Sequence, residues 1–85
     1  MSTKILITGA NGLLGQKLVT ALAQHPSVRV LATGRGPSRL PVGHLAVAMN
    51  EGRFLYQSMD TTKSEEVARI VGDFRPDTIL SLIHI

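Results

Sequence analysis

The chain opens with apolar positions whose spacing changes from that of a strand to that of a helix. A continuous apolar run covers residues 5–7 and stops at Thr8. Such a run is typical of a strand buried in a parallel sheet. After three glycines, leucines recur at the four-residue spacing of one helix face, at Leu14, Leu18 and Leu22. We therefore predict a strand over residues 4–8 and a helix over residues 12–24, which Pro26 helps to end.

Three further strands and a crossover are predicted in the rest of the chain. The second strand covers residues 28–33, with Val28, Val30 and Ala32 on one face and Leu31 on the other. The third covers residues 53–59 and the fourth residues 77–83. Residues 44–50 fit either a short helix or an irregular crossover closed by Gly52.

An apolar stripe at helical spacing precedes the fourth strand, formed by Val67, Ile70, Val71 and Phe74. Thr62 to Glu65 fits a capping box, with Thr62 as the cap and Glu65 reaching back, and Pro76 forces the helix to stop. Strands that alternate with crossover segments predict an α/β fold, and we expect each crossover to be right-handed. The parallel sheet of this fold would have the strand order 3-2-1-4.

Three glycines at three-residue spacing, Gly9, Gly12 and Gly15, separate the first strand from the first helix. Gly9 would permit the positive φ of a sharp turn. Gly12 would leave room for an anion at the helix N-terminus, where free N–H groups and the helix dipole favour negative charge. Gly15 would let the first helical turn pack closely on the strand. The alternative is a tight turn without a ligand, but a strand before and a helix after the glycines favour a phosphate-binding loop.

The charge of this 85-residue chain is unevenly distributed. The net charge is +3, and all six acidic residues lie at or beyond Glu51. An acid-free first half favours an anionic ligand at its loops. Nucleic acid is the rival partner, and it is disfavoured because the basic residues are dispersed and the three aromatic residues do not interleave with them.

The composition also bears on the compartment. The chain has no cysteine, which excludes disulfides and thiolate metal sites and is compatible with a reducing cytosol. No signal-peptide pattern is visible, and no apolar run is long enough to span a bilayer. We expect a cytoplasmic protein with no membrane partner.

The end of the second predicted strand carries basic rather than acidic residues. An NAD site places a carboxylate there to bind the ribose 2′-hydroxyl. This chain instead has Arg35, Ser38 and Arg39, whose guanidinium and hydroxyl groups suit a 2′-phosphate. The alternative is a pair of solvated loop arginines. The pattern favours NADPH, with NAD as a second cofactor.

The segment Ile5-Leu6-Ile7-Thr8-Gly9-Ala10-Asn11-Gly12-Leu13-Leu14-Gly15-Gln16 resembles the N-terminus of the extended short-chain dehydrogenase/reductase superfamily. Within it, the segment is most similar to dTDP-4-dehydrorhamnose reductases. The resemblance covers about the first eighty residues. It implies an incomplete NAD(P)-binding Rossmann-like domain over residues 1–79. It also implies that cofactor contacts come from Gly9, Asn11, Gly12, Leu13, Leu14 and Gly15.

The resemblance also assigns a role to the end of the third strand. In the family, an aspartate just after that strand contacts the adenine amino group, and Asp60, followed by Thr61, matches that position. The alternative for Asp60 is ordinary turn chemistry.

The family's catalytic Tyr-x-x-x-Lys motif is absent. Tyr56 is the only tyrosine, and four residues later stands Asp60. We therefore expect no catalytic residue in this chain, which would be inactive alone, and an active oxidoreductase as its intact parent. The resemblance implies that the parent transfers hydride to the C4 keto group of a dTDP-linked deoxysugar. The alternatives are a sugar-nucleotide epimerase or dehydratase and a non-catalytic NADP-binding regulatory subunit.

The last six residues are identical to one reading-frame translation of a transposase sequencing-adapter end. We therefore expect that residues 80–85 are not native, which a native stop codon after Ile85 would contradict. The fragment would then present an unpaired edge at its fourth strand, which favours aggregation, and would bind a dinucleotide weakly. A soluble monomer with micromolar NADPH affinity would contradict both expectations.

Overall fold

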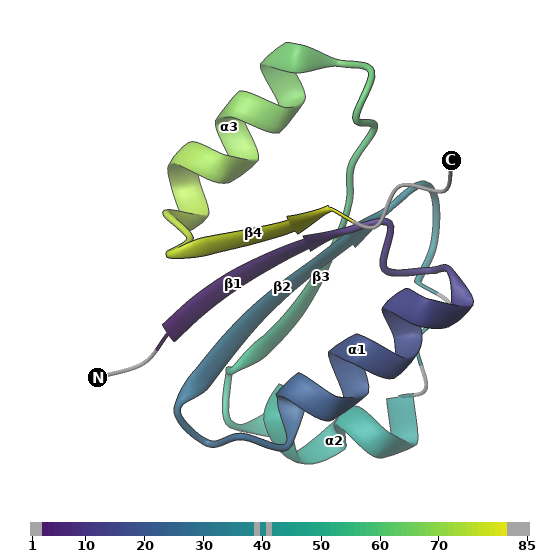
Figure 1. Cartoon of the computed structure of the whole chain (residues 1–85), viewed down its shortest axis with the longest axis vertical. Coiled ribbons are helices and arrows are strands. Elements are labelled where there is room, and N and C mark those ends of the chain that lie inside the picture. Colours follow the sequence, from purple (N-terminus) through teal and green to yellow (C-terminus); the bar gives the residue numbers. More distant parts are fainter. Residues whose placement is uncertain (1–2, 39, 41, 82–85) are drawn as a thin grey trace.

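A computed structural model describes residues 3–38, 40 and 42–81. Within this part, four parallel strands form one sheet, with α1 and α2 on one face and α3 on the other (Figure 1). The sheet order is β3-β2-β1-β4, which confirms the predicted α/β fold and strand order. The elements are β1 (Thr3–Thr8), α1 (Leu13–Ala23), β2 (Val28–Gly34), α2 (Val42–Asn50), β3 (Phe54–Ser58), α3 (Ser64–Phe74) and β4 (Thr78–Ser81).

The sheet separates two apolar cores. The larger core lies between the sheet and the helices α1 and α2, and includes Ile5, Ile7, Val30, Ala32 and Phe54 from the strands. The smaller core lies under α3, where Leu6 and Leu31 are in register and pack with Met59 and Ile70. Leu55 and Ile79 continue this row on the outer strands, but they are 58% and 51% exposed. One helix therefore covers only the middle of this face.

The buried face of α1 differs from the predicted leucine stripe. Leu14 is exposed, and the buried positions are the small residues Gly15, Val19 and Ala23. Leu18 and Leu22 are half-buried at the margin of the core. The reason is the close approach of the first helical turn to the chain beneath it, which leaves room on that face only for small side chains.

Residues 42–50 form a helix, which decides between the two predicted alternatives for this segment. Leu45 and Ala48 of α2 are buried against the sheet. Gly52 follows with a φ of 72°, and its N–H donates to the Met49 carbonyl at 3.1 Å. A positive φ just past a helix end is the conformation that glycine adopts without strain.

The predicted capping box at the start of α3 is wrong. The helix begins at Ser64 with Lys63 as its N-cap, and no side chain caps it. The Thr62 hydroxyl donates instead to Oδ1 of Asp60 at 2.7 Å, and the Asp60 N–H donates to Glu66 at 3.2 Å. The N-cap thus falls on Lys63, one residue after the predicted cap, and a lysine side chain has no acceptor for the N–H groups of the first turn.

Other element boundaries shift by one or two residues from the predictions. β2 extends to Gly34, whereas β3 is shorter than predicted at both ends. The stripe on α3 is confirmed, because Ile70 is buried and its apolar neighbours pack around it. The α3 helix ends at Phe74, followed by Arg75 in the left-handed conformation and then Pro76. The predicted residues 82–83 of the fourth strand lie outside the described residues.

Candidate functional site

Three loops meet at the carboxyl ends of the strands, which is the edge where open parallel sheets bind ligands. They follow β1 (residues 9–12), β2 (residues 35–38 and 40) and β3 (residues 59–63). The Ala10 N–H donates to the Thr33 carbonyl and the Met59 N–H to the Gly34 carbonyl, each at 2.9 Å. Backbone bonds therefore hold the start of each outer loop against the end of β2.

The glycine loop has the backbone geometry that its sequence predicts. Gly9 adopts a φ of 72°, the left-handed region in which a side chain would be strained. A Cβ on Gly15 would lie 2.7 Å from the Cα and carbonyl oxygen of Ala10. The close contact of the first helical turn is thus made with the loop backbone, rather than with the strand as predicted.

The N-terminus of α1 offers an electropositive backbone surface. Its N-cap, Gly12, is extended and makes no side-chain cap hydrogen bond, and the first turn contains no acidic residue. The first N–H groups of a helix have no partner within the helix, and the helix dipole adds positive potential there. Leu13 and Leu14 are 71% and 62% exposed beside this end. The arrangement is suited to an anion that is attached to an apolar group.

Asn11 joins the glycine loop to the loop after β2. Its Nδ2 donates to the carbonyl of Pro37 at 3.1 Å and to that of Arg35 at 3.4 Å. The Tyr56 hydroxyl is a third acceptor at 3.1 Å, so the two N–H groups of Asn11 are shared among three partners. The Asn11 carbonyl in turn accepts a hydrogen bond from Gln16 of α1 at 2.8 Å. These bonds of the Asn11 side chain lead away from the helix N-terminus and into the neighbouring loop.

Tyr56 is a site residue that the sequence analysis missed. Its hydroxyl donates to the Gly36 carbonyl at 2.8 Å, and its ring packs against the core on the side of α1 and α2. The available signal was strand alternation, because Tyr56 shares a face with the buried Phe54. A half-buried tyrosine on that face needs a partner for its hydroxyl.

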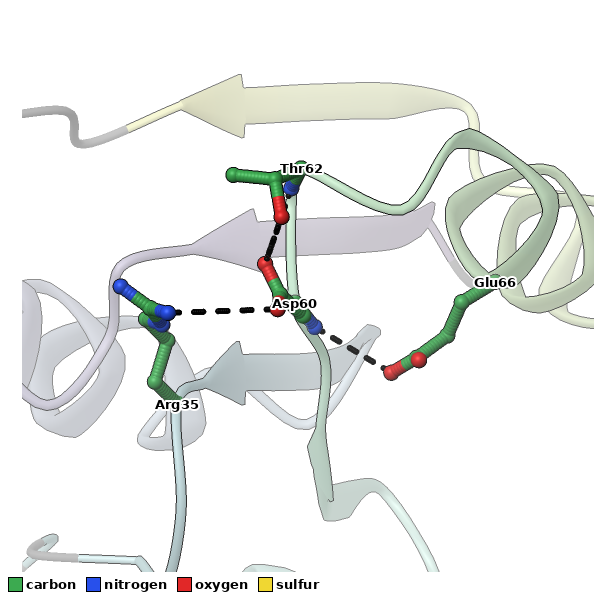
Figure 2. A network of polar contacts seen from close by, with 4 residues as sticks. All are labelled: Arg35, Asp60, Thr62 and Glu66. Atoms are coloured by element: carbon green, nitrogen blue, oxygen red, sulfur yellow. Dashed lines mark hydrogen bonds and ion pairs between the residues drawn. The ribbon is translucent and has the colours of Figure 1, made fainter.

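Arg35 and Asp60 approach each other across the ends of β2 and β3 (Figure 2). The Arg35 guanidinium lies 3.9 Å from Oδ2 of Asp60, and its side chain is 80% exposed. Hydrogen bonds from the hydroxyl and the N–H of Thr62 lower the pKa of Asp60, and the positive charges of Arg35 and Lys63 lower it further. Asp60 is therefore a carboxylate at neutral pH.

The structure gives fewer contacts for the other predicted site residues. Ser38 accepts a hydrogen bond from the Leu40 N–H at 3.2 Å and lines an apolar cavity of about 320 Å³ between α2 and β3. Thr61 is exposed beside Asp60. Arg39 lies outside the described residues. The structure thus gathers the predicted residues that it describes into three adjoining loops and the first turn of α1, at one edge of the sheet.

Comparison with known proteins gives a family and a fold. Residues 5–84 match the sequence profile of the NAD dependent epimerase/dehydratase family. The chain is similar to the solved structure of dTDP-glucose 4,6-dehydratase from Bacillus anthracis in complex with NAD, with a TM-score of 0.79 and 12% identity over 99% of this chain. No curated protein matches the chain.

Two further solved structures show the same fold. The PbgP3 protein from Burkholderia pseudomallei has a TM-score of 0.70 and 22% identity, and an archaeal thiolation-reductase di-domain of a non-ribosomal peptide synthetase has 0.71 and 18%. Each aligns with the whole of this chain. The chain spans only 26–27% of the length of these three structures. No helix in the described part of the chain is long and apolar enough to cross a membrane.

Proposed function

Because this chain belongs to the NAD-dependent epimerase/dehydratase family, we propose that it forms the adenosine-diphosphate end of a nicotinamide dinucleotide site. The observation that carries this proposal is the glycine turn at Gly9, which leads into an uncapped, acid-free helix N-terminus. Backbone N–H groups and the dipole of α1 favour a diphosphate at that position. The bound nicotinamide would accept or supply a hydride.

The residues present fit such a ligand. The Gly15 contact holds the first turn of α1 directly against the Gly9–Ala10 backbone, so the helix N-terminus faces the loop edge of the sheet. Gly12 places no side chain over these amides. The exposed Leu13 and Leu14 would pack beside the dinucleotide, and Asp60, with Thr61 next to it, would accept a hydrogen bond from the adenine amino group.

The cofactor in this proposal is NADPH, with NAD as the second choice. No acidic residue stands at the end of β2, where a carboxylate would bind the 2′-hydroxyl of NAD. Arg35 is exposed there, and a guanidinium binds phosphate through paired N–H donors. Ser38 and Arg39 complete the proposed 2′-phosphate set. NAD is retained because it is the dinucleotide in the similar dehydratase structure.

For the whole protein we propose a sugar-nucleotide oxidoreductase resembling dTDP-4-dehydrorhamnose reductase. Its residues 1–79 would bind the cofactor, and a nucleotide sugar would be its substrate. The second candidate is a sugar-nucleotide epimerase or dehydratase, which the family match and the similar dehydratase structure support. This chain has no Tyr-x-x-x-Lys motif, so its own residues bind and orient the cofactor without moving a proton. Sequencing downstream of the Ile79 codon would identify the native continuation and show whether that motif follows.

Calorimetric titration of the full chain with two nucleotides tests the binding site. 2′,5′-ADP carries the phosphate that distinguishes NADPH, and 5′-ADP lacks it. We expect Arg35→Gln to weaken 2′,5′-ADP binding about tenfold and to leave 5′-ADP binding within about twofold, since a charged hydrogen bond is worth about 1.5–3 kcal/mol.

The matched control is Arg29→Gln, an exposed arginine near the opposite end of the same strand. It should bind both nucleotides like the original chain. If millimolar concentrations of neither nucleotide bind the original chain, the proposed dinucleotide site is wrong. If Arg35→Gln weakens both nucleotides equally, the proposed 2′-phosphate contact is wrong.

A further inference from the structure

A hydrogen-bonded junction ties the loop after β2 to two other segments of the chain. We propose that Tyr56 is a positioning residue, which sets this loop so that it distinguishes a 2′-phosphate from a 2′-hydroxyl. The inference rests on the proposed dinucleotide site and adds a specificity-determining residue to it. Tyr56 itself would touch no part of the ligand.

The Tyr56 hydroxyl uses both its donor and its acceptor capacity at the junction. It donates to the Gly36 carbonyl at 2.8 Å and accepts from Nδ2 of Asn11 at 3.1 Å. Asn11 also donates to the carbonyls on either side of Gly36, those of Arg35 and Pro37. The two N–H groups of Asn11 are thus shared among three acceptors, and the two side chains together bind the carbonyls of residues 35–37.

The hydroxyl is carried by a rigid part of the fold. Tyr56 lies in the middle of β3, in register with Ala32 of the neighbouring strand, and its ring packs on the larger core. A group on a packed strand is located more precisely than one on a loop. The sheet, rather than other loop residues, therefore determines the position of the loop.

Gly34 gives independent support for the junction. A Cβ at this position would lie 2.8 Å from Nδ2 of Asn11 and 3.1 Å from the Tyr56 hydroxyl. The Cβ of any other residue at this position would force one or both of these side-chain groups to shift. The fold therefore keeps a space at Gly34 that the junction fills.

The loop needs this support because its own backbone is permissive. Gly36 has a φ of 74°, and a Cβ built on it meets nothing within 4 Å. A glycine in open space has many accessible conformations, and the direction of the adjacent Arg35 side chain depends on which one is adopted. Fixing the Arg35 and Gly36 carbonyls fixes the point and direction at which the Arg35 side chain leaves the backbone, which reduces the entropic cost of binding.

Tyr56→Phe tests the proposal because it removes the hydroxyl and keeps the ring in the core. We expect this variant to bind 2′,5′-ADP about five- to tenfold more weakly, with 5′-ADP affinity within about twofold of the original, since one or two hydrogen bonds are lost. The NMR order parameters of the Gly36 and Ser38 backbone amides should fall, because the hydroxyl no longer holds the loop. Thr78→Val, which removes an exposed strand hydroxyl from β4, is the control and should change neither quantity.

A second variant, Asn11→Ala, removes the other half of the junction. The measured quantity is the affinity for 2′,5′-ADP divided by that for 5′-ADP. If both residues act through the same loop, this ratio in the double variant should equal the ratio in the single variant that changes it more. The proposal would be overturned if Tyr56→Phe left the ratio of the two affinities unchanged, whether it weakened both nucleotides equally or neither. If the original chain binds neither nucleotide, the dinucleotide site fails first, and unchanged order parameters at Gly36 would then refute the positioning role separately.

Discussion

The guanidinium of Arg35 and the carboxylate of Asp60 lie 3.9 Å apart across the ends of two adjacent strands. The Arg35 side chain is mostly exposed, and an exposed ion pair contributes little to stability. We expect its effect to be on the proposed ligand instead. The arginine proposed to bind a 2′-phosphate is already paired with an anion, so the phosphate would have to compete with Asp60 for it.

Asp60→Asn should therefore shift the chain's preference toward the phosphorylated ligand. Removing the negative charge releases Arg35 and removes a repulsion, so the affinity for 2′,5′-ADP relative to 5′-ADP should rise about threefold or more, as expected for a partly screened charge. Calorimetric titration with both nucleotides measures the ratio. The control is Asp73→Asn, an exposed change near the far end of α3, which should leave the ratio unaltered. A fall in the ratio on Asp60→Asn would contradict a competition between Asp60 and the 2′-phosphate for Arg35.

The lowered pKa of Asp60 makes its contribution to the stability of the fold depend on pH. Because the carboxyl has a lower pKa in the folded chain than in the unfolded chain, its stabilising contribution is present above the unfolded value. That contribution is lost as the pH falls through the folded value. An NMR titration should place the Asp60 midpoint below that of an ordinary aspartate.

Thr62→Val should raise that midpoint toward the ordinary value, since the hydroxyl of Thr62 is the largest cause of the shift. Thr61→Val, a change at the adjacent exposed threonine, is the control and should leave it in place. An Asp60 midpoint that does not respond to Thr62→Val would show that the hydroxyl is not the cause.

Two helical glycines should respond to alanine in opposite directions. Gly15→Ala would place a Cβ 2.7 Å from the Ala10 backbone, and we expect the free energy of unfolding to fall by about 1–3 kcal/mol. Gly72→Ala in α3 meets nothing within 4 Å, and should raise it by about 0.5–1 kcal/mol because alanine is the better helix former. Urea unfolding followed by circular dichroism measures both. A neutral Gly15→Ala would mean that α1 does not pack closely on the loop.

Arg53, directly before β3, holds the chain that follows α1. Its guanidinium donates to the carbonyls of Ala23 and His25 at 3.0 Å each, and it pairs with Glu51. Arg53→Met would leave two carbonyls without this donor and remove a positive charge from a helix C-terminus. The free energy of unfolding should fall by about 1–3 kcal/mol. Arg69→Met on the exposed face of α3 should change it by less than about 0.5 kcal/mol, and equal effects would contradict the proposed role of Arg53.

The sequence predicted those features of the fold that depend on neighbours in the chain. The apolar run before Thr8, the positive φ of Gly9 and the stripe on α3 follow from spacing and backbone sterics over a few residues. The order of the strands follows from the handedness of crossovers. The same local rules misplaced the start of α3, which begins one residue later than predicted and so has Lys63 rather than Thr62 as its N-cap.

By itself the sequence determined a strand, a glycine turn and a helix in the order that dinucleotide sites use, with no acid at the end of the second strand. Only the tertiary structure decided that small residues face the sheet in α1. It also decided that Asn11 turns toward a neighbouring loop and that Tyr56 holds the loop. The Asn11 bonds join residues 24 to 45 positions apart. Local periodicity carries no information over such separations, whereas packing of the strands places these groups within hydrogen-bonding distance.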